Sequence, residues 1–219
     1  MTGPLLLTAL SPAHSPLSPP HSPLLLAALR IEAVIIGGSP PPLVIGMRAA
    51  RLRDDDTLRK VSAHPGPVVI LGYGGGLIPG LRPGDVVVAS ELRDDHGSVI
   101  ETTPRPLRDA VLVQLREAGL VAGVGPLVTV WSLITGRDRG RLAAMGAVVV
   151  DMEAAPVALA RPTGGVVVVR VVADTVGVGI TGAALAHGRR LARALRTAAA
   201  ATTEALGVTT AQAVPVASR

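Results

Sequence analysis

The chain has 219 residues, of which 48% are hydrophobic and 17% charged, a composition typical of a globular protein with one large core. Its formal net charge is +5, but the basic residues are scattered and only one Tyr and one Trp are present, so we expect no nucleic-acid binding. Because the sequence has no cysteine and its five histidines lack metal-ligand spacing, we expect no disulfide, no thiolate nucleophile and no metal site.

The two ends of the chain differ in composition from the middle. Residues 1–22 repeat Ser-Pro and Pro-Pro, which cannot hold a helix, so we expect a disordered N-terminal extension. We expect residues 23–207 to form a single domain and residues 208–219 to form a flexible tail. No apolar run approaches the roughly 20 residues that cross a bilayer, and residues 5–10 are too short for a secretory signal. These features predict a cytoplasmic protein without stable membrane insertion.

Short apolar segments bounded by turn residues recur along the predicted domain. Several are continuous runs of Val, Ile and Leu, a pattern that indicates strands covered on both faces. In chain order, the expected strands are residues 24–29, 43–45, 68–71, 86–89, 127–131, 148–150 and 166–172. The expected helices are residues 57–62, 106–118, 138–145, 153–160 and 184–206. This alternation predicts a three-layer α/β/α fold, in which helices cover both faces of a mixed, mainly parallel sheet.

The first candidate site is a glycine-rich segment after the strand at residues 68–71. Ligands of open α/β sheets bind beyond the carboxyl ends of strands. The glycines of Gly72-Tyr-Gly-Gly-Gly-Leu-Ile-Pro79 let a ligand approach the backbone closely. A dinucleotide-binding fingerprint fits poorly, because Pro79 and Pro83 interrupt the helix that such a fingerprint opens. A plain tight turn is the alternative interpretation.

Four carboxylates near strand ends are candidates for chemistry. Asp151 and Glu153 open a predicted helix, where the helix dipole favours acids, but Glu153 can also accept two hydrogen bonds from a sugar diol. Asp174 follows the last predicted strand, where an acid can protonate a leaving group or merely cap a turn. Glu32 follows the first strand and can orient or deprotonate a water, unless it is a plain surface residue.

Taken in order, these segments resemble the family of purine nucleoside phosphorylases and methylthioadenosine/S-adenosylhomocysteine nucleosidases. The segment from Gly72 looks like that family's glycine-rich loop, Val150-Asp-Met-Glu153 like its ribose-binding signature, and Val169-Arg-Val-Val-Ala-Asp174 like its catalytic strand. The resemblance covers nearly the whole predicted domain. It implies the nucleoside phosphorylase fold, a homo-oligomer, and an enzyme that cleaves the N-glycosidic bond of a purine nucleoside and releases adenine.

The resemblance also implies roles for individual residues. Asp174 would protonate or hydrogen-bond N7 of the purine, and Glu32 would position the attacking water. Glu153 would bind the ribose hydroxyls while Met152 packs on the sugar face. The expected substrate-binding residues are Tyr73, Gly74, Gly75, Trp131, Met152 and Glu153.

Three questions remain open at this stage. The first is whether water or inorganic phosphate attacks the sugar. The phosphorylases carry Arg and Ser where this sequence has Ile70 and Tyr73, which favours water. Arg48 could instead supply a substitute cation that binds inorganic phosphate as a co-substrate. No other cofactor is expected. The second is the substrate: the glycine-rich segment and the strand ending Ala-Ser-Glu-Leu-Arg-Asp94 look most like hopanoid-associated members, thought to remove adenine from adenosylhopane. A methylthioadenosine/S-adenosylhomocysteine nucleosidase is the alternative. The third is whether the chain is a non-catalytic nucleoside-binding relative.

Overall fold

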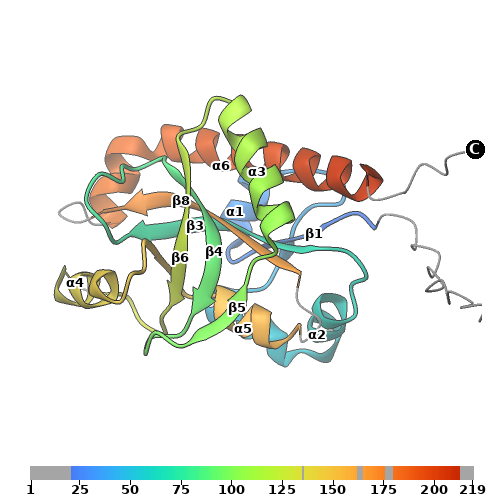
Figure 1. Cartoon of the computed structure of the whole chain (residues 1–219), viewed down its shortest axis with the longest axis horizontal. Helices are drawn as coiled ribbons and strands as arrows, with labels where there is room; N and C mark the ends of the chain where they lie inside the picture. The colour runs from blue at the N-terminus through green and yellow to red at the C-terminus, as the bar shows by residue number, and fades with distance from the viewer. Residues whose placement is uncertain (1–20, 135, 162–164, 176–179, 213–219) are drawn as a thin grey trace, which may run out of the picture.

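The computed structural model describes residues 21–134, 136–161, 165–175 and 180–212 and shows a sheet lying between helices (Figure 1). The strands are β1 (Leu24–Ala27), β2 (Leu43–Val44), β3 (Val68–Gly76), β4 (Val86–Arg93), β5 (Val99–Thr102), β6 (Ala122–Thr129), β7 (Val149–Asp151) and β8 (Val166–Asp174). The helices are α1 (Arg30–Ile36), α2 (Asp55–Ser62), α3 (Arg105–Glu117), α4 (Gly136–Ala144), α5 (Ala154–Leu159), α6 (Ile180–Gln212) and a 3-10 helix, η1 (Met47–Arg53). The predicted extension at residues 1–22 lies almost wholly outside the described residues.

The strands form one mixed sheet of eight strands in the described chain. The parallel pairs are β1–β2, β1–β3, β3–β8, β4–β6 and β6–β7, and the antiparallel pairs are β3–β7, β4–β5 and β4–β8. Five of these strands, β3, β8, β4, β6 and β7, pair in a closed ring, so the sheet curls back on itself. The mixed, mainly parallel sheet predicted from the sequence is confirmed.

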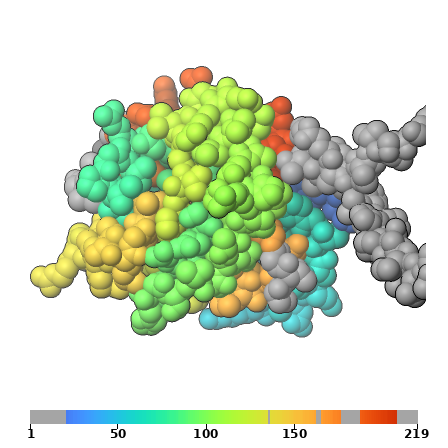
Figure 2. Space-filling model, in the orientation of Figure 1, coloured from blue at the N-terminus to red at the C-terminus, as the bar shows by residue number. Residues whose placement is uncertain are grey.

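Helices cover both faces of the sheet, which confirms the predicted three-layer arrangement. β8 is buried along its whole length, and its alternate residues enter two cores. Val167, Val169 and Val171 face α1, α3 and α6, whereas Val166 and Val168 face η1, α2 and α5. In the space-filling view, α3 and β5, both green, cover the front of the molecule, and α4, in yellow, projects from its edge (Figure 2).

The structure differs from the sequence-based prediction at three elements. β3 continues through Gly76, so the glycines predicted to form a loop are strand residues. None of them has a positive φ, and atoms of neighbouring segments lie within 3.3 Å of the position that a Cβ would occupy at each. α1 was not predicted, because its seven residues are fewer than the roughly 10–12 over which a helical pattern can be recognised. β5 was not predicted either, because it is a four-residue, largely exposed edge strand without an apolar run.

α6 is the longest described helix and packs against α3 and β8. Its buried face is built from Leu191, Leu195 and Ala198. The helix reaches Gln212 and so passes residue 207, where we expected the domain to end. Among the described residues, no helix combines the length and the apolar character that a bilayer crossing requires.

Candidate active site

The three sequence segments singled out above meet at the glycine-rich end of β3. In the strand register, Gly75 lies between Val150 of β7 and Asp174 of β8. A Cβ added to Gly75 would lie 3.0 Å from Cγ1 of Val150 and 3.1 Å from Oδ1 of Asp174, and one added to Gly74 would lie 3.0 Å from the Val150 carbonyl oxygen. Glycine is therefore required here by the close approach of neighbouring strands rather than by a turn.

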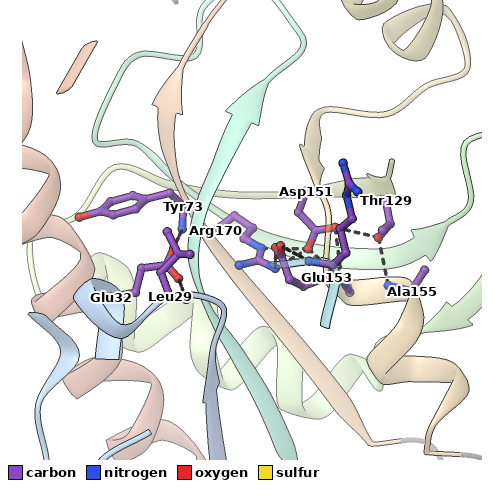
Figure 3. A network of polar contacts seen from close by, with 10 residues as sticks. Leu29, Glu32, Tyr73, Thr129, Asp151, Glu153, Ala155 and Arg170 are labelled. Atoms are coloured by element: carbon purple, nitrogen blue, oxygen red, sulfur yellow. Dashed lines mark hydrogen bonds and ion pairs between the residues drawn. The ribbon is translucent and has the colours of Figure 1, made fainter. Parts of the chain in front are cut away.

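Arg170 lies in the middle of β8 and is 0% exposed. Its Nε donates to Oδ2 of Asp151 at 3.1 Å, and its Nη2 donates to the same oxygen and lies 3.5 Å from Oε2 of Glu153 (Figure 3). A buried guanidinium requires such pairing, because removing the charge from water costs on the order of several kcal/mol. Sequence reasoning missed Arg170. The sequence does carry a signal, since Arg170 is the single charge inside a run of valines. An arginine in a buried strand is almost always paired with an acid, so its position indicates a buried carboxylate partner.

Asp151 is held by bonds that organise the start of α5. Besides Arg170, its carboxylate accepts a hydrogen bond from Oγ1 of Thr129 at 2.7 Å and one from the backbone N–H of Ala154 at 3.1 Å. Thr129 Oγ1 in turn accepts from the N–H of Ala155 at 3.0 Å. These contacts agree with Asp151 being a carboxylate that stabilises the start of α5. Because its oxygens already accept several hydrogen bonds, they have little capacity left for a ligand.

Glu153 is buried, and among the described residues its carboxylate has two hydrogen-bond partners. Its Oε1 accepts from the backbone N–H of Arg48 at 3.2 Å, and its Oε2 lies 3.5 Å from Arg170. Burial raises the pKa of Glu153, and Arg170 acts in the opposite direction. A carboxylate has about four acceptor positions, so this group keeps capacity for a sugar diol.

Arg48 reaches this site through its backbone. Its guanidinium belongs to an exposed residue, whereas its N–H points at Glu153. Arg48 and its neighbour Ala49 have φ values of 55° and 50°, a left-handed conformation that is costly for residues with a Cβ. This strained turn aims the Arg48 N–H at the Glu153 carboxylate.

Glu32 lies on α1 and is also buried. Its Oε1 accepts a hydrogen bond from the N–H of Tyr73 and its Oε2 accepts one from the N–H of Leu29, each at 2.9 Å. A Cβ added to Gly72 would lie 2.7 Å from Oε1 of Glu32 and 2.7 Å from Nη1 of Arg170, so both groups border the same glycine. Among the described residues, that Nη1 has no hydrogen-bond acceptor although it is buried. An unpartnered donor beside a carboxylate suits a small ligand that both donates and accepts hydrogen bonds.

Asp174 forms a second charged group at the other side of the glycines. Its Oδ2 accepts a short hydrogen bond from Nη2 of Arg139 on α4, and Nη1 of Arg139 donates to the carbonyl oxygen of Gly76 at 2.8 Å. Burial raises the pKa of Asp174, an effect that Arg139 opposes. Sequence reasoning missed Arg139, because it is one of three arginines between residues 137 and 141 and nothing in the sequence distinguishes it from the others.

The side chains of the remaining predicted site residues, Tyr73, Trp131 and Met152, take no part in the two charged groups described above. The Tyr73 ring packs against the core formed with α1 and α6, and its side chain points away from Arg170 (Figure 3). Burial and then the Glu32 carboxylate raise the pKa of Tyr73. Trp131 is 53% exposed, and Met152 packs beside Leu77 and Val128 in a small third core. Their roles toward a substrate stay predictions.

The polar groups form two carboxylate–arginine clusters on either side of the β3 glycines. One cluster holds Arg170 with three carboxylates and the other holds Arg139 with Asp174, so the region suits a ligand whose hydroxyl or ring-nitrogen groups hydrogen-bond to carboxylates. In the part of the chain that the structure describes, no three His, Asp or Glu side chains converge in a group that could hold a metal ion. Acid–base chemistry and hydrogen bonding are what these residues offer.

Comparisons with known proteins found solved structures of similar fold. The 5′-methylthioadenosine/S-adenosylhomocysteine nucleosidase of Campylobacter jejuni matches with a TM-score of 0.68 and 12% identity, covering 84% of this chain and 98% of that one. The futalosine hydrolase of Helicobacter pylori matches with a TM-score of 0.66 and 16% identity, covering 86% and 98%. The nucleosidase of Colwellia psychrerythraea, solved with adenine, matches with a TM-score of 0.63 and 20% identity, covering 88% and 95%.

These structural matches establish a shared fold. A search of curated proteins found no match to the chain. A family model described as the phosphorylase superfamily matches residues 34–207, which include β3, β7 and β8 with their carboxylates and glycines. The chain belongs to the phosphorylase superfamily.

Proposed function

We propose that the protein cleaves the N-glycosidic bond of a purine nucleoside and releases the free base. The observation that carries this proposal is the placement of buried acids around the β3 glycines, with Asp174 on one side and Glu153 and Glu32 on the other. Family membership and the nucleosidase and hydrolase neighbours support it.

In the proposed reaction, Asp174 acts on the base. Burial raises the pKa of Asp174, which favours a protonated carboxyl that can donate its proton to N7 of the purine. The base then leaves with the electron pair of the glycosidic bond, while the ribose gains oxocarbenium character. Glu153 would hold the ribose hydroxyls, because within the described ranges its carboxylate accepts from Arg48 at 3.2 Å and Arg170 at 3.5 Å and so keeps acceptor capacity.

We propose water as the nucleophile, positioned by Glu32 and Arg170. The unpartnered Nη1 of Arg170 would donate a hydrogen bond to the water oxygen, and Glu32 would accept a proton as the oxygen attacks the sugar carbon. Phosphate is favoured less, because the positions where phosphorylases carry Arg and Ser hold Ile70, fully buried, and Tyr73. Arg48 approaches Glu153 through its backbone N–H, and its exposed guanidinium is the candidate anchor for phosphate.

We further propose that the substrate carries an adenosyl group and that the protein is a homo-oligomer. The neighbour from Colwellia psychrerythraea was solved with adenine, which supports adenine as the base. Exposed apolar side chains on α1, Ile31 and Val34, support a contact between copies. Light scattering of the purified protein measures the assembly directly, and a monomer mass would contradict the second point.

The test of the proposed function is chromatographic detection of free base. The protein is incubated with methylthioadenosine, S-adenosylhomocysteine, adenosine and adenosylhopane, each with and without phosphate. Adenine and a free sugar in the absence of phosphate would support hydrolysis, whereas adenine and a sugar 1-phosphate formed only with phosphate would assign the nucleophile to phosphate. Binding of these nucleosides without base release would support the non-catalytic alternative.

The Asp109→Asn variant is a matched control for substitutions of the acids. Asp109 is a surface carboxylate whose ion pair with Arg108 lies on α3, away from the glycines of β3. Exposed ion pairs contribute about 0–1 kcal/mol, so this variant should cleave every substrate at the wild-type rate.

A further inference from the structure

We propose that Arg139 is a positioning residue for Asp174: its guanidinium anchors one carboxylate oxygen so that the other is presented to the base beside Gly75. This inference rests on the proposed function, because it assigns a partner to the acid of that reaction. Arg139 itself is not placed in contact with the substrate.

The geometry of the guanidinium supports anchoring. Arg139 is buried, and it makes two contacts in different directions, from Nη2 to Oδ2 of Asp174 and from Nη1 to the Gly76 carbonyl oxygen at 2.8 Å. A guanidinium has its donors in a fixed plane, so binding both groups fixes the carboxylate relative to the edge of β3. The Gly76 carbonyl belongs to a paired strand, so it holds the Arg139 guanidinium in a fixed position.

The second carboxylate oxygen faces the glycine strand. Oδ1 of Asp174 lies 3.1 Å from the position that a Gly75 Cβ would occupy, and Nη1 of Arg139 lies 3.3 Å from the same point. The acid and its anchor therefore meet at a residue without a side chain. In the proposed reaction the base would approach Oδ1, whereas Oδ2 would stay with Arg139.

No other described charge competes for this carboxylate. On β8, Arg170 turns to Asp151 and Glu153. The adjoining end of β3 contributes only glycines. Before β4, Asp85 accepts a hydrogen bond from the Arg82 N–H at 2.8 Å. Among the described residues, Arg139 is thus the charged group that acts on Asp174, and it favours the ionised form while burial favours the neutral one.

The consequence for catalysis concerns proton supply. Asp174 takes up a proton from solvent and passes it to N7 as the glycosidic electron pair moves onto the base. Removing the charge of Arg139 should let Asp174 keep its proton at higher pH, and removing the hydrogen bonds of Arg139 should leave the carboxyl misaligned.

The experiment compares Arg139→Gln, Arg139→Lys and Arg137→Gln in the full-length protein. Arg137 is an exposed arginine on the same helix, so its substitution removes the same charge without touching Asp174. The first readout is the pH dependence of kcat/KM, and the second is the ¹³C NMR titration of aspartate carboxyls, with Asp174→Asn identifying the resonance of Asp174.

We expect kcat/KM of Arg139→Gln to fall about 10²-fold at its optimum through misplacement of the acid, with the alkaline limb moved to higher pH. Arg139→Lys should return that limb toward wild type, because the charge is kept, and Arg137→Gln should match wild type. A merely structural role would lower kcat/KM equally at all pH values, and that result would overturn the inference.

The NMR titration separates this inference from the proposed function. An upward shift of the Asp174 midpoint in Arg139→Gln supports the Arg139 anchor even if wild-type protein releases no base, in which case only the proposed function fails. An unchanged midpoint in Arg139→Gln overturns the inference even if wild-type protein is an active nucleosidase.

Discussion

Replacing Gly72 with alanine should damage the site without removing any polar group. The added Cβ would lie 2.7 Å from Nη1 of Arg170, 2.7 Å from Oε1 of Glu32 and 3.1 Å from Cδ of Glu32. Optimal contacts lie at about 3.5–4.0 Å, so each charged group must move by about 1 Å. Neither moves freely, because Glu32 holds the N–H groups of Leu29 and Tyr73 and Arg170 holds Asp151.

The expected cost follows from these contacts. Overpacking a buried site costs about 1–3 kcal/mol, and a backbone N–H left without its acceptor costs about 1–3 kcal/mol more. We therefore expect Gly72→Ala to lose about 2–6 kcal/mol of the free energy of unfolding, measured by urea denaturation with an unchanged m-value. The proposed nucleoside cleavage should fall with it, because Glu32 and Arg170 are displaced together.

Gly123→Ala is the matched control for this substitution. Gly123 lies on β6 without a positive φ, and a Cβ there would meet no atom within 4 Å. Alanine at such a position should stabilise the protein by about 0.4–1 kcal/mol, through the lower entropy of the unfolded chain. If Gly72→Ala were as stable as Gly123→Ala, the close approach of Glu32 and Arg170 at Gly72 would be refuted.

Two further predictions concern the buried charges. Arg170→Met should lose about 3–5 kcal/mol in urea denaturation because Asp151 and Glu153 would remain buried without their cation, and a loss below about 1 kcal/mol would contradict the pairing. Glu153→Gln should change how stability depends on pH. Since burial raises the pKa of Glu153 above its ordinary 4.5, the folded protein binds this proton more tightly than the unfolded chain does. Its contribution to the free energy of unfolding is therefore lost as pH rises from about 4.5 through the raised pKa. Denaturation across this range should show a shallower loss in Glu153→Gln than in wild type, and identical slopes would exclude the titration of Glu153 as the cause.

Much of the fold could be predicted because its strands are buried on both faces. The valines of β8 enter cores on opposite sides of the sheet, so the strand reads as a continuous apolar run. β5 has four residues, and its exposed edge gives no such run. The glycines of β3 were assigned to a loop because the atoms that require them, such as those of Val150 and Arg170, belong to other segments.

The candidate site was predicted only in part for a similar reason. Glu153 and Asp174 stand at strand ends, where sequence and topology together point to a ligand. Arg170 pairs with Asp151, 19 positions away, and Arg139 pairs with Asp174, 35 positions away. No local pattern marks either arginine as a partner, and only the folded chain brings these charges together.

Base release by wild-type protein and by Asp174→Asn is the most direct test of the proposed cleavage. Free adenine is quantified by chromatography after incubation with methylthioadenosine, with Asp109→Asn as control and urea denaturation to confirm that each variant is folded. We expect adenine release by wild type and Asp109→Asn, and a rate about 10²–10⁴-fold lower in a folded Asp174→Asn, because an amide cannot supply the proton. Equal rates in wild type and Asp174→Asn would contradict the assignment of Asp174 as the acid.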